Sequence, residues 1–208
     1  MNPKTISPTE ALTRLKEGNQ RFMTGTLKED STLHAVRRAA LLEAQNPFAV
    51  ILGCSDSRVP AEIIFDQGLG DLFVIRVAGN IVAPSQLGSI EFAVQQFGVG
   101  LVVVVGHSRC GAIDATLKNI RSQEPAATTN IASIVARIRP ALEPLARALS
   151  KEDPLLLQQA AVLANVQASV NQIRRGTSLL ENLSILQHLV VAGASYDLAS
   201  GEVMFLDF

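Results

Sequence analysis

The chain contains little cysteine, few aromatic residues and no tryptophan. Among its 208 residues are two Cys, one Tyr and eight Phe. Two thiols are too few for a disulfide framework, and a chain of this length buries roughly 70% of its unfolded surface without one. Cys54 and Cys110 are therefore either buried, inert thiols or parts of a metal or reactive site, and their neighbours must decide.

An excess of one charge and a long apolar run are also missing. Lys plus Arg (18) nearly balance Asp plus Glu (19), which gives no electrostatic basis for binding nucleic acid. No run reaches the roughly eighteen apolar residues of a membrane span, and the N-terminus lacks the apolar core of a signal peptide. We expect a cytoplasmic protein with no nucleic-acid or membrane partner, unless a leader was removed.

Helical periodicity and continuous apolar runs alternate along the chain. Helical patterns cover residues 8–22, about 33–45, 84–98, 131–148 and 156–175, and residues 107–120 predict a short loop followed by another helix. The apolar runs 47–53, 71–79 and 101–106 are typical of buried parallel strands. Residues 186–208 predict two strands around the turn Ala199-Ser200-Gly201. This order predicts one α/β domain over 1–208: a mostly parallel sheet flanked by helices, with an antiparallel edge strand. Residues 1–45 would form an N-terminal helical arm and 46–208 the core.

Three potential metal ligands follow two of the predicted strands. Cys54 comes directly after the run ending at Gly53, while His107 and Cys110 follow the run 101–106. Because ligands bind beyond the carboxyl ends of parallel strands, these side chains are predicted to share one crevice. Two thiolates and one imidazole favour zinc over magnesium or calcium, and three protein ligands leave a fourth position for water.

Asp56 and Arg58 alternate with Cys54 along the same exit. Alternate residues of an extended segment share a face, so Arg58 can hold Asp56 in a bidentate pair. Asp56 could then coordinate the metal as a fourth ligand in a closed state, or it could accept a hydrogen bond from the metal-bound water. The alternative is that Asp56 and Arg58 form an ordinary surface ion pair. Two thiolates neutralise Zn²⁺, so its water would be less acidic than the pKa of about 7 known for such sites, and activity should rise at mildly alkaline pH.

The sequence around these residues resembles the β-class carbonic anhydrases. Their patterns C-x-D-x-R and H-x-x-C are present as CSDSR (54–58) and HSRC (107–110), and similarity extends from LKEGNQRF to VVAGASYDLASGEV. The resemblance implies one zinc per subunit on Cys54, His107 and Cys110. It also implies reversible hydration of CO₂ to bicarbonate by zinc-bound hydroxide, with the Asp56–Arg58 dyad gating the fourth position. A homodimer or homotetramer is implied, with N-terminal helices wrapping a neighbour.

The same resemblance suggests three residues of the substrate pocket. Gln45 would orient substrate or would be an ordinary residue that ends the second helix, and Phe73 would form an apolar wall or simply pack in the core. Phe92 stands where many members have tyrosine. Some bacterial members use a tryptophan in an inhibitory bicarbonate pocket, and this chain has none.

Two other functions fit the same residues. A related zinc hydrolase would attack CS₂ or COS, which are linear molecules like CO₂. A non-catalytic zinc or redox-sensing scaffold would instead form a Cys54–Cys110 disulfide when the metal is lost, although a purely structural zinc needs no Asp56–Arg58 pair.

Overall fold

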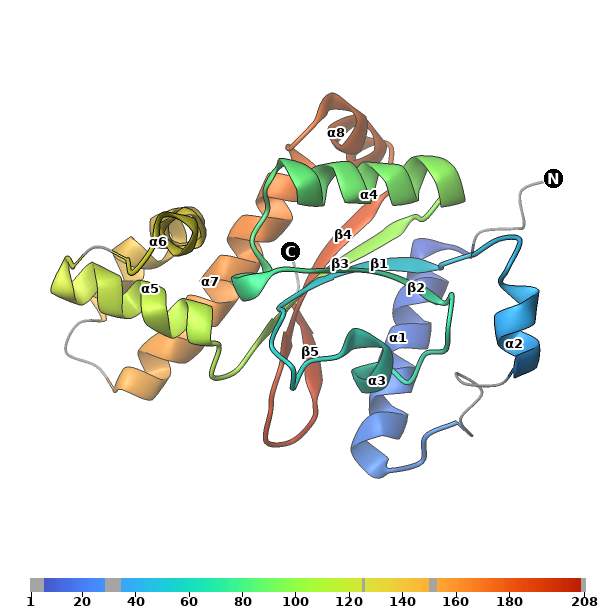
Figure 1. Cartoon of the computed structure of the whole chain (residues 1–208), viewed down its shortest axis with the longest axis horizontal. Helices are drawn as coiled ribbons and strands as arrows, with labels where there is room; N and C mark the ends of the chain where they lie inside the picture. The colour runs from blue at the N-terminus through green and yellow to red at the C-terminus, as the bar shows by residue number, and fades with distance from the viewer. Residues whose placement is uncertain (1–5, 29–34, 125, 150–152, 207–208) are drawn as a thin grey trace.

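A five-stranded sheet crosses the molecule (Figure 1). The computed structural model describes residues 6–28, 35–124, 126–149 and 153–206. The strands are β1 (Ala49–Gly53), β2 (Leu72–Arg76), β3 (Leu101–His107), β4 (Val190–Tyr196) and β5 (Val203–Leu206), in the order β2-β1-β3-β4-β5. The first four are parallel and β5 pairs antiparallel with β4, which confirms the predicted sheet and its edge strand.

Both faces of the sheet are buried, as the continuous apolar runs predict. Alternate residues of a strand point to opposite faces, and Ile51 lies in one core cluster while Leu52 lies in another. Helices α1 (Pro8–Thr24) and α3 (Ala61–Ile64) cover the first face, and α4 (Pro84–Phe97), α7 (Pro154–Arg174) and α8 (Ser178–Ile185) cover the second (Figure 1).

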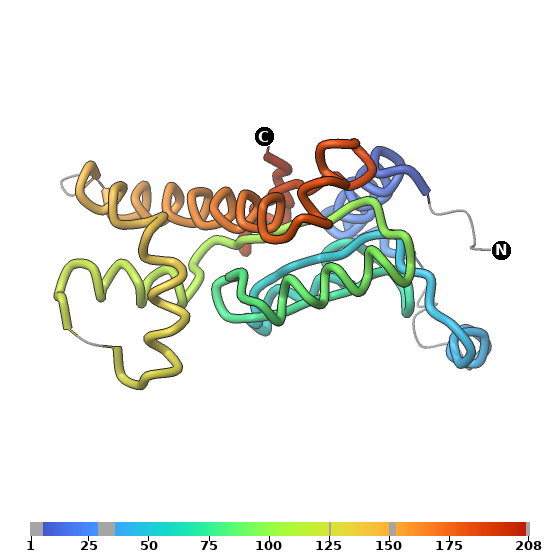
Figure 2. The backbone as a smooth tube through the Cα atoms, turned by 90° about the horizontal axis from the view of Figure 1, so that it is seen from above, coloured from blue at the N-terminus to red at the C-terminus, as the bar shows by residue number. Residues whose placement is uncertain are grey.

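A third cluster lies beyond the carboxyl end of the sheet. It joins α5 (Gly111–Ser122), α6 (Thr129–Ala148) and the start of α7, and it includes both cysteines. Helix α7 extends from this cluster to the sheet (Figure 2), where it packs against β3 and β4. One helix therefore connects the predicted metal ligands to the main core. None of the helices in the described ranges is long and apolar enough to cross a membrane.

Two predicted elements have other bounds in the structure, and two helices of the structure were not predicted. The second helix, α2, spans only Ala35–Ala40 within the described residues, so Gln45 does not end it. The chain must extend toward β1 after α2, and Pro47 disfavours a helical conformation at Asn46. The predicted strand 71–79 ends at Arg76, and Ala78–Asn80 form a 3₁₀ turn, η1, because Gly79 has φ 71°. Helices α3 and α8 were not predicted, although the Thr177 side chain, which accepts from the Leu180 N–H, is a start signal for α8.

Helix α1 lies against the core of its own chain through a glycine. A Cβ at Gly18 would stand 1.8 Å from the carbonyl oxygen of Phe65, so no larger residue fits without moving α1 from α3. Gly88, inside α4, has open space around it and an ordinary φ.

We predict that Gly18→Ala lowers the free energy of unfolding by about 1–3 kcal/mol, because it forces the helix and the Phe65 backbone apart. Gly88→Ala should raise it by about 0.5–1 kcal/mol, because alanine loses less backbone entropy in a helix. Urea unfolding of both variants measures the two changes in the free energy of unfolding. Equal changes in the two variants would show that the close approach of α1 to Phe65 does not constrain the fold.

Candidate metal centre

The structure brings Cys54, His107 and Cys110 together. Cys54 follows β1, His107 ends β3, and Cys110 precedes the first turn of α5. All three are buried, and one ligand atom from each lies within 4.8 Å of the others. Ligand sulfur and nitrogen atoms about 2.0–2.3 Å from one ion would have such mutual spacing. Both cysteines are free thiols rather than a disulfide.

The imidazole of His107 presents one nitrogen to this cluster. Its Nδ1 lies 2.9 Å from the carbonyl oxygen of Ser108, so a proton on Nδ1 is donated there and the lone pair is left on Nε2. Nε2 is buried and has no hydrogen-bond partner among the described residues. A buried polar atom left unpaired is costly, and a ligating histidine usually donates its other N–H to a carbonyl. The donor set therefore fits a metal ion.

The pKa values of the two thiols are shifted in opposite directions. A hydrogen bond from the Cys110 thiol lowers the pKa of Cys54 to about 4, against the effect of burial; His107 and the Gly79 amide act in the same direction. The same hydrogen bond, together with burial, raises the pKa of Cys110. The hydrogen bond between the two sulfur atoms thus favours a thiolate at one of them, and the thiolate is the form that binds metal.

Asp56 and Arg58 form a bidentate pair beside the cluster. Arg58 Nε donates to Asp56 Oδ1 over 2.9 Å and Nη2 donates to Oδ2 over 2.7 Å; the Arg58 backbone N–H also donates to Oδ1 over 3.0 Å. The segment is a turn rather than the extended exit predicted, since the Val59 N–H donates to the Asp56 carbonyl. This turn brings Arg58 back onto Asp56. Asp56 Oδ2 lies 3.9 Å from His107 Nε2.

The charge of this carboxylate is fixed by its partner. Hydrogen bonding from the Arg58 side chain holds the pKa of Asp56 well below its usual range, although partial burial acts the other way. Asp56 is consequently ionised at neutral pH and can only accept hydrogen bonds. Arg76, which sequence reasoning missed, donates to the carbonyl oxygens of Cys54 (2.9 Å) and Asp56 (2.5 Å) and so fixes the backbone between them.

The three predicted pocket residues lie apart from the cluster within one chain. Gln45 is exposed between α2 and β1. Phe73, on β2, packs its ring 6.2 Å from that of Phe92 and 6.0 Å from that of Phe97, both on α4. Phe92 is 51% exposed. Phe73 pairs with Val50, early in β1, whereas Cys54 follows the end of that strand. These aromatic rings therefore form a separate patch at the β2 edge.

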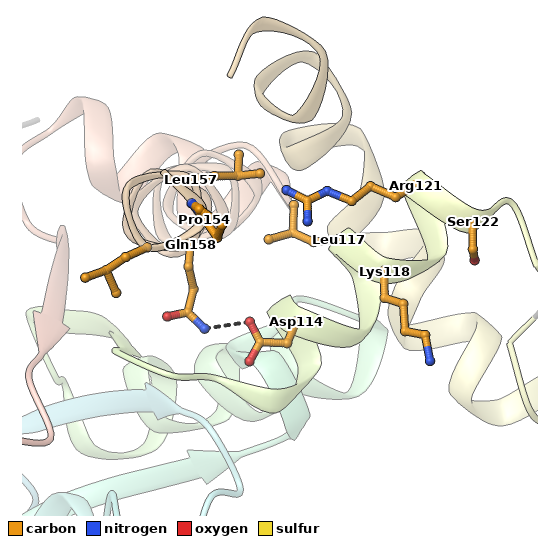
Figure 3. A pocket seen from close by; sticks show the side chains of 9 residues that line it. Asp114, Leu117, Lys118, Arg121, Ser122, Pro154, Leu157 and Gln158 are labelled. Atoms are coloured by element: carbon orange, nitrogen blue, oxygen red, sulfur yellow. Dashed lines mark hydrogen bonds between the residues drawn. The ribbon is translucent and has the colours of Figure 1, made fainter. Parts of the chain in front are cut away.

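Two hollows lie near the cluster. One of about 790 Å³ is lined by Arg58, Ser108 and Arg109 on one side and by parts of α7 and the β4–β5 hairpin on the other. A second hollow, of about 650 Å³, lies between α5 and the start of α7 (Figure 3). Gln158 of α7 donates a hydrogen bond to Asp114 of α5 there, over 2.6 Å. Only the first hollow touches a predicted site residue, Arg58.

Comparisons with known proteins agree with this geometry. The family model "Carbonic anhydrase" matches residues 49–203. A carbonic anhydrase of Mycolicibacterium smegmatis is 41% identical over 199 residues, covering 95% of this chain and 92% of that protein. Among solved structures, the β-carbonic anhydrase CcaA superimposes with a TM-score of 0.77 at 26% identity, covering 95% of this chain and 88% of that one. A tetrameric β-carbonic anhydrase of Sordaria macrospora shares the fold, with a TM-score of 0.73 at 22% identity and coverage of 96% and 95%. The chain belongs to the β-class carbonic anhydrase family.

Proposed function

We propose that this protein binds one zinc ion per subunit through Cys54, His107 and Cys110 and catalyses the reversible hydration of CO₂ to bicarbonate. The observation that carries the proposal is the buried trio of two thiols and an imidazole, next to an ionised carboxylate; the imidazole Nε2 has no hydrogen-bond partner in the part of the chain that the structure describes. Zinc suits this soft donor set better than oxygen-seeking magnesium or calcium. A cytoplasmic location is part of the same proposal.

The family supports CO₂ as the substrate, rather than CS₂ or COS. The curated relative from Mycolicibacterium smegmatis is named carbonic anhydrase and is similar over nearly the whole chain. When bound, zinc would supply Lewis acidity and a water made acidic enough to attack a linear electrophile.

Asp56 would then orient the nucleophile. Being ionised, it accepts a hydrogen bond from a water beside the cluster, which leaves the oxygen lone pair free to attack carbon. Its Oδ2, 3.9 Å from His107 Nε2, is close enough to reach a small group at this position.

Arg58 would control Asp56. Its bidentate pair holds the carboxylate in place, and its Nη2 also lies 3.3 Å from the carbonyl oxygen of Arg109. The Arg58 side chain is 52% exposed, and exposed ion pairs are weak, so Asp56 could leave Arg58 and take the fourth position of the metal. The dyad would act in this way as a gate.

A homodimer or homotetramer would complete the substrate pocket. Gln45 is exposed and the Phe73–Phe92 patch lies apart from the cluster of its own chain. A role for these three residues therefore requires that they line the site of a neighbouring copy. Sedimentation analysis should find more than one subunit per particle.

Metal removal tests the proposed cofactor. Dialysis against a strong chelator should abolish CO₂ hydration, and one equivalent of Zn²⁺ per chain should restore it, because the two sulfur atoms and the imidazole already lie close enough together to share one ion. Magnesium should not restore it. Full activity in protein shown by elemental analysis to be free of metal would refute the zinc assignment.

A further inference from the structure

Two buried polar side chains interrupt an apolar face of α7. Asn165 and Ser169 lie one helical turn apart and are 3% and 2% exposed, among neighbours such as Val166 and Val170 that are fully buried. Burying polar groups in a core is costly unless they form hydrogen bonds. Asn165 Nδ2 donates to the carbonyl oxygen of Gly79 over 2.8 Å, and Ser169 Oγ donates to that of Asn80 over 3.0 Å.

Both bonds end on the η1 turn, whose backbone is unusual. Gly79 has φ 71° and Asn80 has φ 43°, so two consecutive residues are left-handed. Glycine adopts this conformation freely, and asparagine adopts it more readily than most residues with a Cβ. A Cβ at Gly79 would also lie 2.7 Å from Ile138 Cδ1. The two hydrogen bonds from α7 therefore fix the position of this turn relative to the helix.

The η1 turn also contacts the cluster of predicted metal ligands. The backbone N–H of Gly79 donates to Cys54 Sγ over 3.4 Å, in a buried environment. A donor to a ligand sulfur stabilises its negative charge and orients its lone pairs toward the metal. Contacts thus run from α7 through Gly79 to the thiolate.

We propose that Asn165 and Ser169 are positioning residues for the metal-binding thiolate of Cys54 and act through the Gly79 amide. This inference rests on the metal site of the proposed function. The alternative is that the two side chains only stabilise the fold.

Asn19 provides a matched control for that alternative. It is also 3% exposed, and its side chain also bonds buried backbone: it donates to the carbonyl oxygens of Ile64 and Gly201 and accepts from the Val203 N–H. These bonds join α1, α3 and the β4–β5 hairpin. Asn19→Ala should therefore destabilise the protein without a direct effect on Cys54.

The test compares Asn165→Ala with Asn19→Ala and with the wild type. Zinc affinity is measured by competition with a chelator, and the thiolate-to-cobalt charge-transfer band is recorded on cobalt-substituted protein. Asn165→Ala should weaken zinc binding about 10- to 100-fold and move the band to longer wavelength, because a thiolate without its N–H donor gives up charge more easily. Asn19→Ala should leave the band in place.

Ser169 supplies a milder pair of variants in case Asn165→Ala does not fold. Ser169→Ala should shift the band in the same direction by less, and Ser169→Thr, which keeps the hydroxyl, should restore it. An unchanged band and unchanged zinc affinity in folded Asn165→Ala or Ser169→Ala would overturn this inference and leave the proposed function intact. Wild-type protein that binds neither zinc nor cobalt would remove the proposed function, and this inference with it.

Discussion

Cys54→Ser is expected to release the metal and, with it, CO₂ hydration. Structural zinc sites with four ligands contribute roughly 10–16 kcal/mol, so loss of one thiolate should weaken zinc binding by at least about 100-fold. The effect should be severe here because Cys54 is one of only three clustered donors among the described residues. Elemental analysis after gel filtration measures the zinc that remains.

Ser57→Ala is the control for this variant. Ser57 is exposed in the same turn, so its loss should change neither zinc content nor turnover. Cys54→Ser protein that retained one zinc per chain and full activity would show that Cys54 is not a ligand.

Asp56→Asn is expected to keep zinc and to lose most of the turnover. The substitution retains the shape of the side chain but removes the charge that makes Asp56 an obligate acceptor, and it weakens the bidentate pair with Arg58. General acid–base and orienting groups contribute about 10²- to 10⁴-fold, so we expect a loss of about 100-fold or more in kcat. Stopped-flow assays on protein of known zinc content separate the rate effect from metal loss.

Asp114→Asn provides a matched control. Asp114 is exposed on α5 and accepts a hydrogen bond from Gln158 outside the cluster. Replacing its carboxylate with the asparagine amide should therefore leave turnover unchanged. Near-normal kcat in zinc-loaded Asp56→Asn would exclude an orienting role for the carboxylate.

The lowered pKa of Asp56 also bears on the pH profile. A carboxyl group whose pKa in the folded protein is depressed stays ionised through the neutral and alkaline range, and its contribution to stability is lost only as the pH falls through that low value. A rise of activity between about pH 7 and 9 therefore cannot come from Asp56. It must come from the nucleophile, which a thiolate-rich metal site acidifies only moderately.

The elements that bear the ligands could be predicted because their signals are local. Continuous apolar runs identified β1 and β3, and parallel strands end at one edge of a sheet, so Cys54, His107 and Cys110 were expected to meet there. The structure places them together. The bidentate Asp56–Arg58 pair was predicted from alternate residues of an extended segment; the pair is present, but a turn rather than an extended segment brings the two side chains together.

The residues that hold the metal ligands in place could not be predicted, because their role depends on contacts between segments that are distant in the sequence. Apolar residues continue through Val77 and Ala78, so nothing in the pattern marks the end of β2 before the η1 turn. Asn165 and Ser169 are ordinary residues of a helical pattern until α7 lies against Gly79 and Asn80, more than 80 residues away. The exposed position of Gln45 similarly depends on how the chain leaves α2.

The most direct test of the account is CO₂ hydration by zinc-loaded protein, followed by stopped flow with a pH indicator from about pH 7 to about pH 9. We predict fast turnover that rises with pH, because the negative charge of two thiolates makes the nucleophilic water less acidic, so that it loses its proton only at mildly alkaline pH. Turnover no faster than buffer across this range, in protein with one zinc per chain, would contradict the proposed function and favour the CS₂ or COS hydrolase or the non-catalytic scaffold.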